Sequence, residues 1–403
     1  MRDVHPTDMQ SPASEFSDVS LPVYLDNQSS TPLDPRVADY MEPFLREKFG
    51  NPHAGAHRYG WEAEAAVDVA RENVAALIGA EAGEIIFTSG ATESCNFAIK
   101  GACAYAPKER RTIVVSSVEH KCVLETAEFM RRAGFRVAFA PVDEDGIVRM
   151  EALKKRVDDD VFMVSVMAAN NEIGTIQPVA EIGALCREKG ALFHCDAAQA
   201  AGKIPIDVRA SHIDLLSVSA HKMYGPKGIG ALYVRRKPRV RLEPLLHGGG
   251  QERGLRSGTV PTMLAAGFGE AARIGKKALA DGEPERIRLL SRLFIEEIRV
   301  FCPNAPINGC ETRRLPGNVN MSFPGIDAGA LIASLREVAA SAGSACASSG
   351  TESSYVLKAL GVSQERVAGA VRFSLGRFTT EREARFAARA AGIKAVQLNL
   401  ARK

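Results

Sequence analysis

Seven short apolar segments between residues 84 and 234 constrain the fold of this chain more than any other feature. They are rich in β-branched residues, and segments with helical periodicity separate most of them. The expected strands are 84–89, 111–117, 135–142, 161–169, 191–198, 213–220 and 229–234, with intervening helices such as 119–133 and 178–189. Near-continuous apolar strands that alternate with helices are typical of a parallel sheet covered on both faces. The sequence therefore predicts an α/β domain with a mainly parallel seven-stranded sheet, whose ligands bind at the C-terminal ends of the strands.

The pattern changes after about residue 280, which indicates a second, smaller α+β domain. A charged helix is expected over 283–301 and another helix over 327–338. A final helix should begin at Thr380, because Thr380 and Glu383 have the spacing of a capping box.

These patterns divide the chain into three parts. We expect a large domain over 33–275 and a small domain formed by 22–32 and 276–403. Residues 1–21 are polar and acidic, and lack the apolar core or arginine-rich character of a targeting peptide. This segment is predicted to be a disordered extension.

Composition narrows the functional classes. The formal net charge of +3 is spread along the chain, which does not indicate binding to nucleic acid or to a membrane surface. No run approaches the 18 or so apolar residues of a membrane span. The eight cysteines contain no C-x-x-C pair, so we expect reduced thiols rather than disulfides or a metal site, and a cytoplasmic protein.

Polar side chains follow four of the predicted strands. "TSGATES" (88–94) could bind an anion at a helix start, or could be an ordinary N-cap turn. His120 follows the second strand, Asp196 the fifth and Lys222 the sixth, and each alone is more simply read as structural. Together they place an anion site, an acid, a histidine and a lysine along one edge of one sheet.

Pyridoxal phosphate (PLP) requires this combination of groups. It needs a lysine amine for its aldehyde, a carboxylate for its pyridine nitrogen and donors around its phosphate. A nucleotide site is less well supported, because the sequence contains neither G-x-x-x-x-G-K-[ST] nor a G-x-G-x-x-G after a strand.

Ten motifs then occur in an order that resembles one family. They are "YLDNQSSTPLDPRV", "GNPHAGAHRYG", "FTSGATES", "EH", "NNEIGT", "DAAQAAGKIPID", "SAHKMYGPKGIGALYVRR", "GGGQERGLRSGT", "SAGSACASSG" and "VRFSLGRFTT". Together they resemble the cysteine desulfurases of the iron–sulfur cluster and nitrogen-fixation type, which are PLP enzymes of the class V aminotransferase group. The resemblance covers about residues 22–380 and implies the fold-type I architecture of PLP-dependent transferases.

The resemblance also implies a role for individual residues. Lys222 would form the Schiff base, Asp196 would pair with the pyridine nitrogen, and His120 would stack on the ring and relay protons. The other cofactor-binding positions implied are Ala91, Thr92, Asn171, Gln199, Ser219, Ala220, His221 and, from the second subunit of a homodimer, Thr259. Asn171 and Arg372 would bind the substrate, since a guanidinium fork matches a carboxylate.

Cys346, within "SAGSACASSG", lies at the nucleophile position of the family. The implied reaction converts L-cysteine to L-alanine and leaves a persulfide on Cys346 for an iron–sulfur scaffold or a sulfur relay protein. Cys95 and Ala198 depart from the usual residues, and only 26 residues follow Arg377, which leaves the acceptor open. A selenocysteine lyase would share nearly all these residues, a transaminase would not need Cys346, and a degenerate scaffold would not need the whole set.

Overall fold

One sheet contains all seven predicted strands. The computed structural model describes residues 15–342 and 353–401 of the 403-residue chain. In spatial order the strands are β2 (Ile85–Thr88), β8 (Gly230–Val234), β7 (Leu215–Ser219), β6 (Leu192–Asp196), β5 (Val161–Ser165), β3 (Thr112–Ser116) and β4 (Arg136–Ala140). β8 runs antiparallel to both of its neighbours, and the other four pairs are parallel. The predicted mainly parallel seven-stranded sheet is confirmed.

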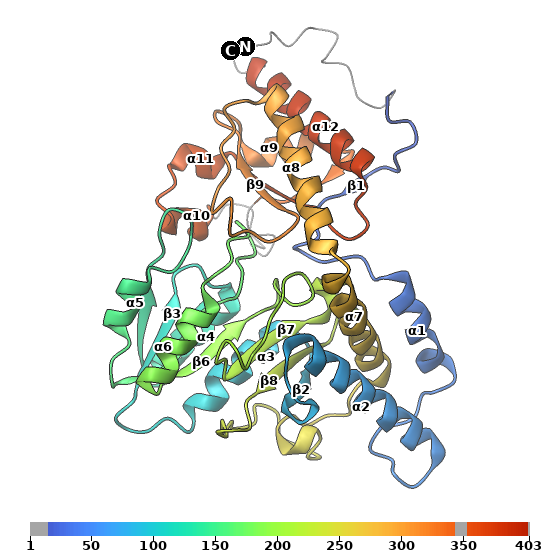
Figure 1. The fold of residues 1–403 in the computed structure, drawn as a ribbon, viewed down its shortest axis with the longest axis vertical. Coiled ribbons are helices and arrows are strands. Elements are labelled where there is room, and N and C mark those ends of the chain that lie inside the picture. Colours follow the sequence, from blue (N-terminus) through green and yellow to red (C-terminus); the bar gives the residue numbers. More distant parts are fainter. Residues whose placement is uncertain (1–14, 343–352, 402–403) are drawn as a thin grey trace.

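Helices cover both faces of this sheet (Figure 1). Successive strand side chains enter two different hydrophobic clusters: Ile85 and Phe87 lie in one and Ile86 in the other. The first cluster includes residues of α2 (Arg58–Ile78), α5 (Met150–Arg156), α6 (Val179–Lys189) and α7 (Thr262–Ala280). The second includes residues of α3 (Ala91–Asn96), its π-helical continuation η4 (Phe97–Gly101) and α4 (Lys121–Arg132). α1 (Pro35–Arg46) packs on the outside of α7.

Short segments at the C-terminal edge of the sheet connect the strands to the candidate site. The 3₁₀ turn η5 (Ala220–Lys222) follows β7 directly, and η3 (Ala82–Glu84) and η6 (Glu252–Gly254) lie elsewhere on the large domain.

β5 ends four residues before the predicted limit at 169, although residues 166–169 remain buried. The segment keeps some strand-like pairing, since Val166 N and Ala168 N donate to the backbone oxygens of His194 and Asp196 on β6, which agrees with its apolar, strand-like sequence.

The C-terminal part forms a second hydrophobic core, which lies above the large sheet in Figure 1. Its elements are β1 (Val23–Tyr24), α8 (Glu283–Phe301), β9 (Asn318–Ser322), α9 (Ala328–Ser334), β10 (Val338–Ala339), β11 (Ala370–Ser374) and α12 (Glu381–Leu400). The buried residues of α10 (Tyr355–Ala359) and α11 (Gln364–Ala368) belong instead to the first cluster of the large domain. β9 and β11 pair antiparallel, and β1 pairs parallel with β10. The predicted capping box is present, since the Thr380 side chain accepts from Glu383 N and the Glu383 side chain from Thr380 N.

Two further local predictions differ from the structure. The helix expected over 327–338 ends at Ser334, because the backbone at Val338 pairs with Val23 and cannot continue a helix. The disordered extension was expected to reach residue 21, but Phe16 is buried against Phe386, and Asp18 forms an ion pair with Arg382 at 2.5 Å. Residues 15–21 therefore pack on α12, and residues 1–14 lie outside the described part of the chain.

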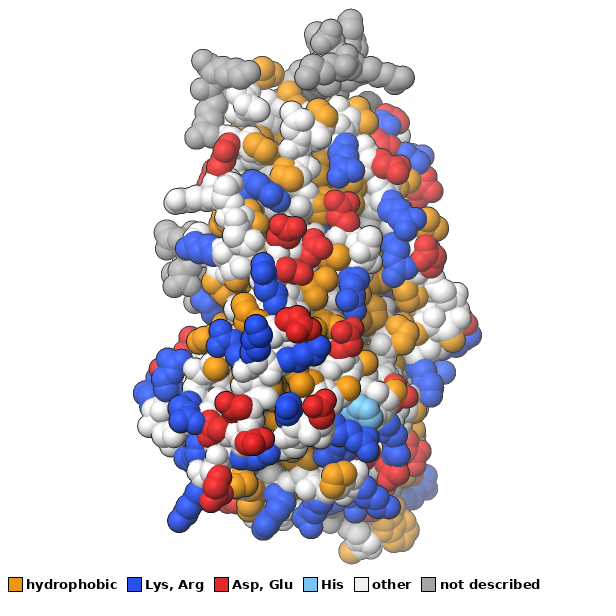
Figure 2. All heavy atoms as spheres, turned by 60° about the vertical axis from the view of Figure 1, so that its left-hand side comes forward, with side chains coloured by type: hydrophobic (Ala, Val, Ile, Leu, Met, Phe, Trp, Pro, Cys, Tyr) orange, Lys and Arg blue, Asp and Glu red, His pale blue; other side chains and the backbone are white. Residues whose placement is uncertain are grey.

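The surface carries both signs of charge. Basic and acidic side chains are interspersed on the face shown in Figure 2. None of the helices in residues 15–342 and 353–401 combines the length and apolar composition needed to cross a membrane.

Candidate active site

A cavity of about 560 Å³ lies where the predicted site residues converge. Its walls include ten of them: Ala91, Thr92, His120, Asn171, Asp196, Gln199, Ser219, His221, Lys222 and Arg372. Parallel strands end at the same edge of a sheet, which is why residues far apart in the sequence meet here. Ala220 is buried behind the wall, and Thr259 is exposed and does not line this cavity. Cys346 lies outside the described residues.

Asp196 provides a buried carboxylate at the end of β6. Its Oδ1 accepts a hydrogen bond from Ala198 N at 2.9 Å. Burial raises the pKa of Asp196, whereas this backbone hydrogen bond and the nearby His120 and Lys222 act in the opposite direction. A cationic group bound in the cavity beside Asp196 would stabilise its ionised form.

Lys222 enters the cavity from the turn after β7. Its Nζ donates hydrogen bonds to the carbonyl oxygens of Gln28 and Ser29, each at 2.7 Å. A second ammonium lies nearby on Lys203, whose Nζ donates to Gln199 Oε1 at 3.3 Å. Burial, together with the positive charges of Lys222 and Arg372, lowers the pKa of Lys203 to about 7. The site therefore concentrates cationic side chains.

His120 is the N-cap residue of α4. Its Nδ1 accepts a hydrogen bond from Cys122 N at 3.2 Å, which fixes the orientation of the ring. A ring nitrogen that accepts this bond carries no proton, so the neutral imidazole has its proton on Nε2. His120 can consequently present a face or an N–H to a molecule in the cavity.

The start of α3 and the end of β7 form a donor-rich end of the cavity. Gly90, with φ +152°, precedes the backbone N–H groups of Ala91 and Thr92. Ser219 and His221 line the same cavity. The adjacent Glu93 carboxylate pairs with Arg256 at 2.9 Å, so its negative charge is compensated. Free N–H groups and hydroxyls at a helix start suit a phosphate group.

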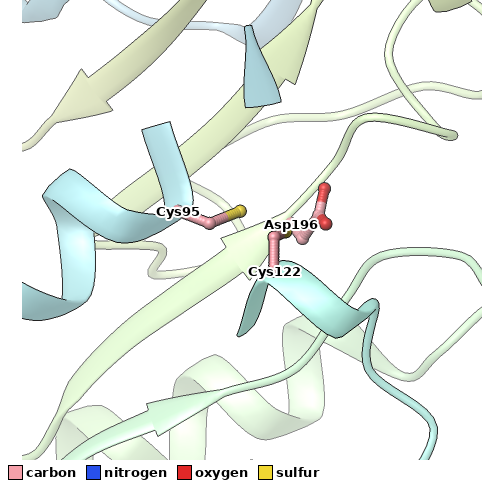
Figure 3. Close-up of side chains that lie close together, drawn as sticks. All are labelled: Cys95, Cys122 and Asp196. Atoms are coloured by element: carbon pink, nitrogen blue, oxygen red, sulfur yellow. The ribbon is translucent and has the colours of Figure 1, made fainter. Parts of the chain in front are cut away.

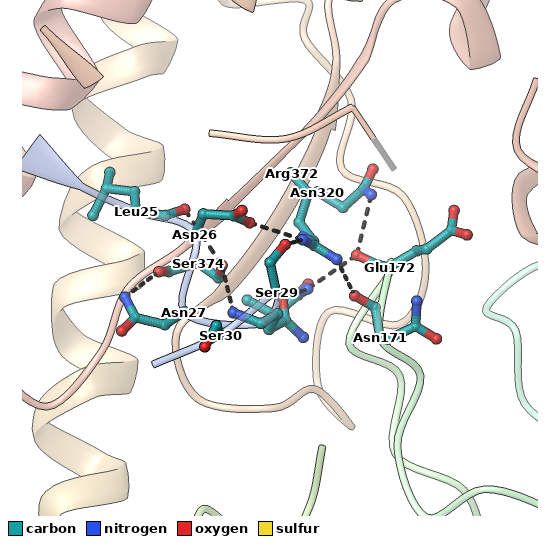
Figure 4. Close-up of polar contacts among 12 residues, drawn as sticks. Leu25, Asp26, Asn27, Ser29, Ser30, Asn171, Glu172, Asn320, Arg372 and Ser374 are labelled. Carbon is teal, nitrogen blue, oxygen red and sulfur yellow. Dashed lines mark hydrogen bonds and ion pairs between the residues drawn. The ribbon is translucent and has the colours of Figure 1, made fainter. Parts of the chain in front are cut away.

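Arg372 connects three separate segments beside the cavity (Figure 4). Its Nη1 donates to the carbonyl oxygen of Asn171 at 2.7 Å. Its Nη2 pairs with Asp26 Oδ1 at 2.8 Å and donates to Ser29 Oγ at 2.7 Å. The side chain is only 2% exposed, yet it lines the cavity, so its guanidinium is held in a defined position.

Several buried polar atoms around the cavity lack a partner among the described residues. They are Gln28 Nε2, Asn171 Oδ1 and Glu172 Oε1. Unsatisfied buried polar atoms are costly, and at a cavity wall they are typical of a binding site. The structure thus provides polar atoms for a ligand on both the donor and the acceptor side.

Sequence reasoning did not single out four residues that shape this site: Gln28, Ser29, Cys122 and Glu172. Gln28 and Ser29 belong to the quoted motif "YLDNQSSTPLDPRV", so a signal was present, but no residue chemistry pointed to them. Cys122 lies two residues after His120 and Glu172 directly after Asn171. Their closeness in sequence to His120 and Asn171 was the signal that could have identified Cys122 and Glu172 as site residues.

Comparison with known proteins agrees with this geometry. A family model described as aminotransferase class-V matches residues 23–385. The curated protein "Cysteine desulfurase IscS" of Rickettsia bellii (strain OSU 85-389) is 49% identical over 374 residues, which are 93% of this chain and 91% of that protein. The protein of the same name from Rickettsia rickettsii (strain Iowa) is 48% identical, with the same coverage.

Solved structures show the same relationship. A structure titled "NIFS-LIKE PROTEIN" has a TM-score of 0.86 and 39% identity, over 92% of this chain and 98% of that one. "SspA in complex with cysteine" has a TM-score of 0.77 and 36% identity, over 89% of this chain and 100% of that one. The chain belongs to the class V aminotransferase family. Within that family its curated relatives carry the name cysteine desulfurase, which confirms the resemblance seen in the motifs.

Proposed function

We propose that this chain is a PLP-dependent cysteine desulfurase. The reaction is L-cysteine plus an enzyme thiol giving L-alanine and an enzyme persulfide, so one sulfur atom is transferred from the substrate to the enzyme thiol. The observation that carries the proposal is that Asp196, Lys222 and Arg372 line a single cavity. The names of the curated relatives support the same activity.

The residues of the cavity fit PLP. Asp196 is a buried carboxylate whose pKa is raised by burial, and a protonated pyridine nitrogen would compensate it. The N–H groups of Ala91 and Thr92, with Ser219 and His221, would hold the phosphate. Gln199 would contact the ring hydroxyl, and His120 would stack on the ring. When bound, PLP supplies an electron sink for the bond that breaks at the substrate α-carbon.

The protein groups then bind the substrate and move its protons. Arg372 would bind the carboxylate of L-cysteine with both arms of its guanidinium, assisted by Asn171. Lys222 would accept the α-proton at Nζ, since it enters the same cavity as Asp196 and Arg372. His120 would relay a proton to the departing carbon fragment.

Cys346 is the proposed nucleophile toward the substrate sulfur. The proposal rests on its motif, because its position is outside the described residues. As a thiolate it would form the new S–S bond while the carbon–sulfur bond breaks. The resulting persulfide would pass to an iron–sulfur scaffold or a sulfur relay protein, in a cytoplasmic homodimer to which Thr259 of each chain contributes.

Product analysis with a Cys346→Ser variant tests the function. The parent protein with PLP should form alanine and, with a reducing thiol, sulfide in equal amounts from L-cysteine. Cys346→Ser should bind PLP normally but lose more than about 90% of turnover, because a neutral hydroxyl is a poor nucleophile toward sulfur. Cys302→Ser serves as the matched control and should keep parental turnover.

The same assay separates the alternatives. Turnover of selenocysteine but not cysteine would indicate a selenocysteine lyase. Amino transfer to a keto acid that survives in Cys346→Ser would indicate a transaminase. Either result would overturn the proposal.

A further inference from the structure

Two thiols face each other beside the candidate cofactor site (Figure 3). Cys95 belongs to α3 and Cys122 to α4, two helices on the same face of the large sheet. Their sulfur atoms and a carboxylate oxygen of Asp196 all lie within 4.8 Å of one another. Among the described residues this is the only such group of thiols and carboxylates.

The two thiols differ in access. Cys122 lines the cavity together with Asp196 and His120, whereas Cys95 is fully buried behind it. A reagent that enters the cavity therefore meets Cys122 first. A molecule bound against Asp196 and His120 lies over the same wall and blocks this route.

The two thiols also differ in reactivity. Cys122 lies in the first turn of α4, where the helix dipole and the adjacent Lys121 favour a negative charge. Interaction with the Cys95 thiol lowers the pKa of Cys122, aided by His120 and opposed by burial. The same interaction and burial raise the pKa of Cys95. Cys122 is thus the thiol more readily ionised for attack on an oxidant, and Cys95 remains a thiol that can react with oxidised Cys122.

We propose that Cys122 and Cys95 form an oxidation site that a hydroperoxide closes to a disulfide when the cofactor cavity is unfilled. The Cys122 thiolate attacks the peroxide oxygen, giving a sulfenic acid and, with hydrogen peroxide, water after proton uptake. Cys95 then attacks the sulfenic sulfur and releases a second water. In sum, two thiols and one peroxide give one disulfide and two waters.

Closure changes the environment of Asp196. Burial raises the pKa of this carboxylate, and Cys95 is one of the groups that oppose the rise. Disulfide formation removes the Cys95 thiol hydrogen and brings the sulfur atoms of Cys95 on α3 and Cys122 on α4 to about 2 Å from each other. Resting on the proposed function, we expect the oxidised protein to bind PLP more weakly, so that oxidation keeps the cofactor-free enzyme inactive until a dithiol reduces it.

Peptide mapping tests the oxidation site without an activity assay. The full chain, with and without PLP, is treated with hydrogen peroxide, alkylated and digested with trypsin. Cys95 falls in peptide 72–100 and Cys122 in peptide 122–131, and each peptide contains a single cysteine. We expect a 72–100/122–131 cross-link in the PLP-free protein that dithiothreitol removes. With PLP at about 100 times its dissociation constant, closure should slow about 100-fold, because only unfilled sites react.

Two variants sharpen the result. Cys95→Ser should abolish the cross-link and leave Cys122 as a sulfenic acid that dimedone traps. Cys122→Ala should abolish both the cross-link and the dimedone adduct at this site. Failure to find the cross-link in PLP-free protein, a cross-link from Cys122 to Cys346 instead, or equal rates with and without PLP would each overturn the proposal. Unchanged PLP affinity after oxidation would overturn the proposed effect on the cofactor, whereas lack of desulfurase activity would bear only on the proposed function.

Discussion

Lys222 and Lys227 both line the candidate cavity, and their surroundings distinguish their roles. Lys222 is partly buried and its Nζ is fixed by two carbonyl oxygens, whereas Lys227 is exposed. We expect Lys222→Ala to reduce alanine formation by about a thousandfold or more, since a general base is lost together with the amine that anchors the cofactor. Lys227→Ala should reduce it by less than about threefold.

Borohydride reduction followed by peptide mapping provides the check. The pyridoxyl label should appear on the peptide that contains Lys222. A label on Lys227 would contradict the assignment even if both variants lost activity.

The hydrogen bonds around Arg372 predict how its replacement changes the binding of L-cysteine. Lysine cannot reproduce its hydrogen bonds to Asn171, Asp26 and Ser29, nor bind a carboxylate with two parallel donors. Arg372→Lys should therefore raise KM for L-cysteine about tenfold or more, equivalent to roughly 1.4 kcal/mol, with a smaller effect on kcat.

Steady-state kinetics on two variants test this expectation. Arg366→Lys serves as the control. Arg366 contacts Ile307 and Asn308 away from the cavity, so its replacement should leave KM for L-cysteine unchanged. An equal rise of KM in both variants would indicate a general loss of structure rather than a lost substrate contact.

At the level of elements, the centre of the large sheet contains a buried histidine. His194 of β6 lies within hydrogen-bonding distance of Ser165 Oγ on β5 at 2.8 Å and Ser217 Oγ on β7 at 3.0 Å. Burial lowers the pKa of His194 to about 3. Below its ordinary pKa of 6.5, the unfolded chain takes up a proton that the folded chain excludes until the pH approaches 3. The stability of the fold therefore decreases as the pH falls through this window.

This linkage predicts a measurable pH dependence. Between pH 7.5 and pH 5, His194 should reduce the free energy of unfolding by about 2 kcal/mol. His194→Gln keeps polar atoms for the two serines but does not titrate. In denaturant unfolding, its free energy of unfolding should therefore fall by about 2 kcal/mol less than that of the parent between pH 7.5 and pH 5. His247→Gln, at an exposed position, should retain the parental pH dependence. A parental dependence in His194→Gln would contradict the assignment.

At the level of the whole molecule, the proposed homodimer would complete the candidate site. Thr259 is exposed and does not line the cavity of its own chain, although its motif implies contact with the cofactor phosphate. Large apolar side chains are also exposed around α1 and α2, among them Tyr40, Phe49 and Trp61. Exposed apolar clusters of this kind are typical of subunit interfaces.

A mixing experiment tests whether sites are shared. Thr259→Asp places a negative charge against the phosphate, and Lys222→Ala removes the catalytic amine, so each variant alone should be nearly inactive. In a heterodimer one site carries both changes and the other carries neither. After refolding an equal mixture, random pairing should restore about one quarter of parental activity. No recovery, with heterodimers demonstrated by mass, or a fully active monomer in sedimentation, would contradict shared sites.

The sequence alone determined the strands and the polar residues at their ends. Apolar runs and helical periodicity are local properties, so the seven strands, the helix over 283–301 and the cap at Thr380 could all be predicted. The strand-end positions of His120, Asp196 and Lys222 followed, because parallel strands share one C-terminal edge.

Only the tertiary structure decided which distant segments meet. Lys222 contacts Gln28, 194 residues away, and Arg372 pairs with Asp26, 346 residues away. Cys95 and Cys122 are adjacent because their helices cover the same face of the sheet, a fact that depends on strand order. Strand order and helix placement arise from long-range packing, which leaves no periodic signal in the local sequence, and for this reason these contacts could not be predicted from it.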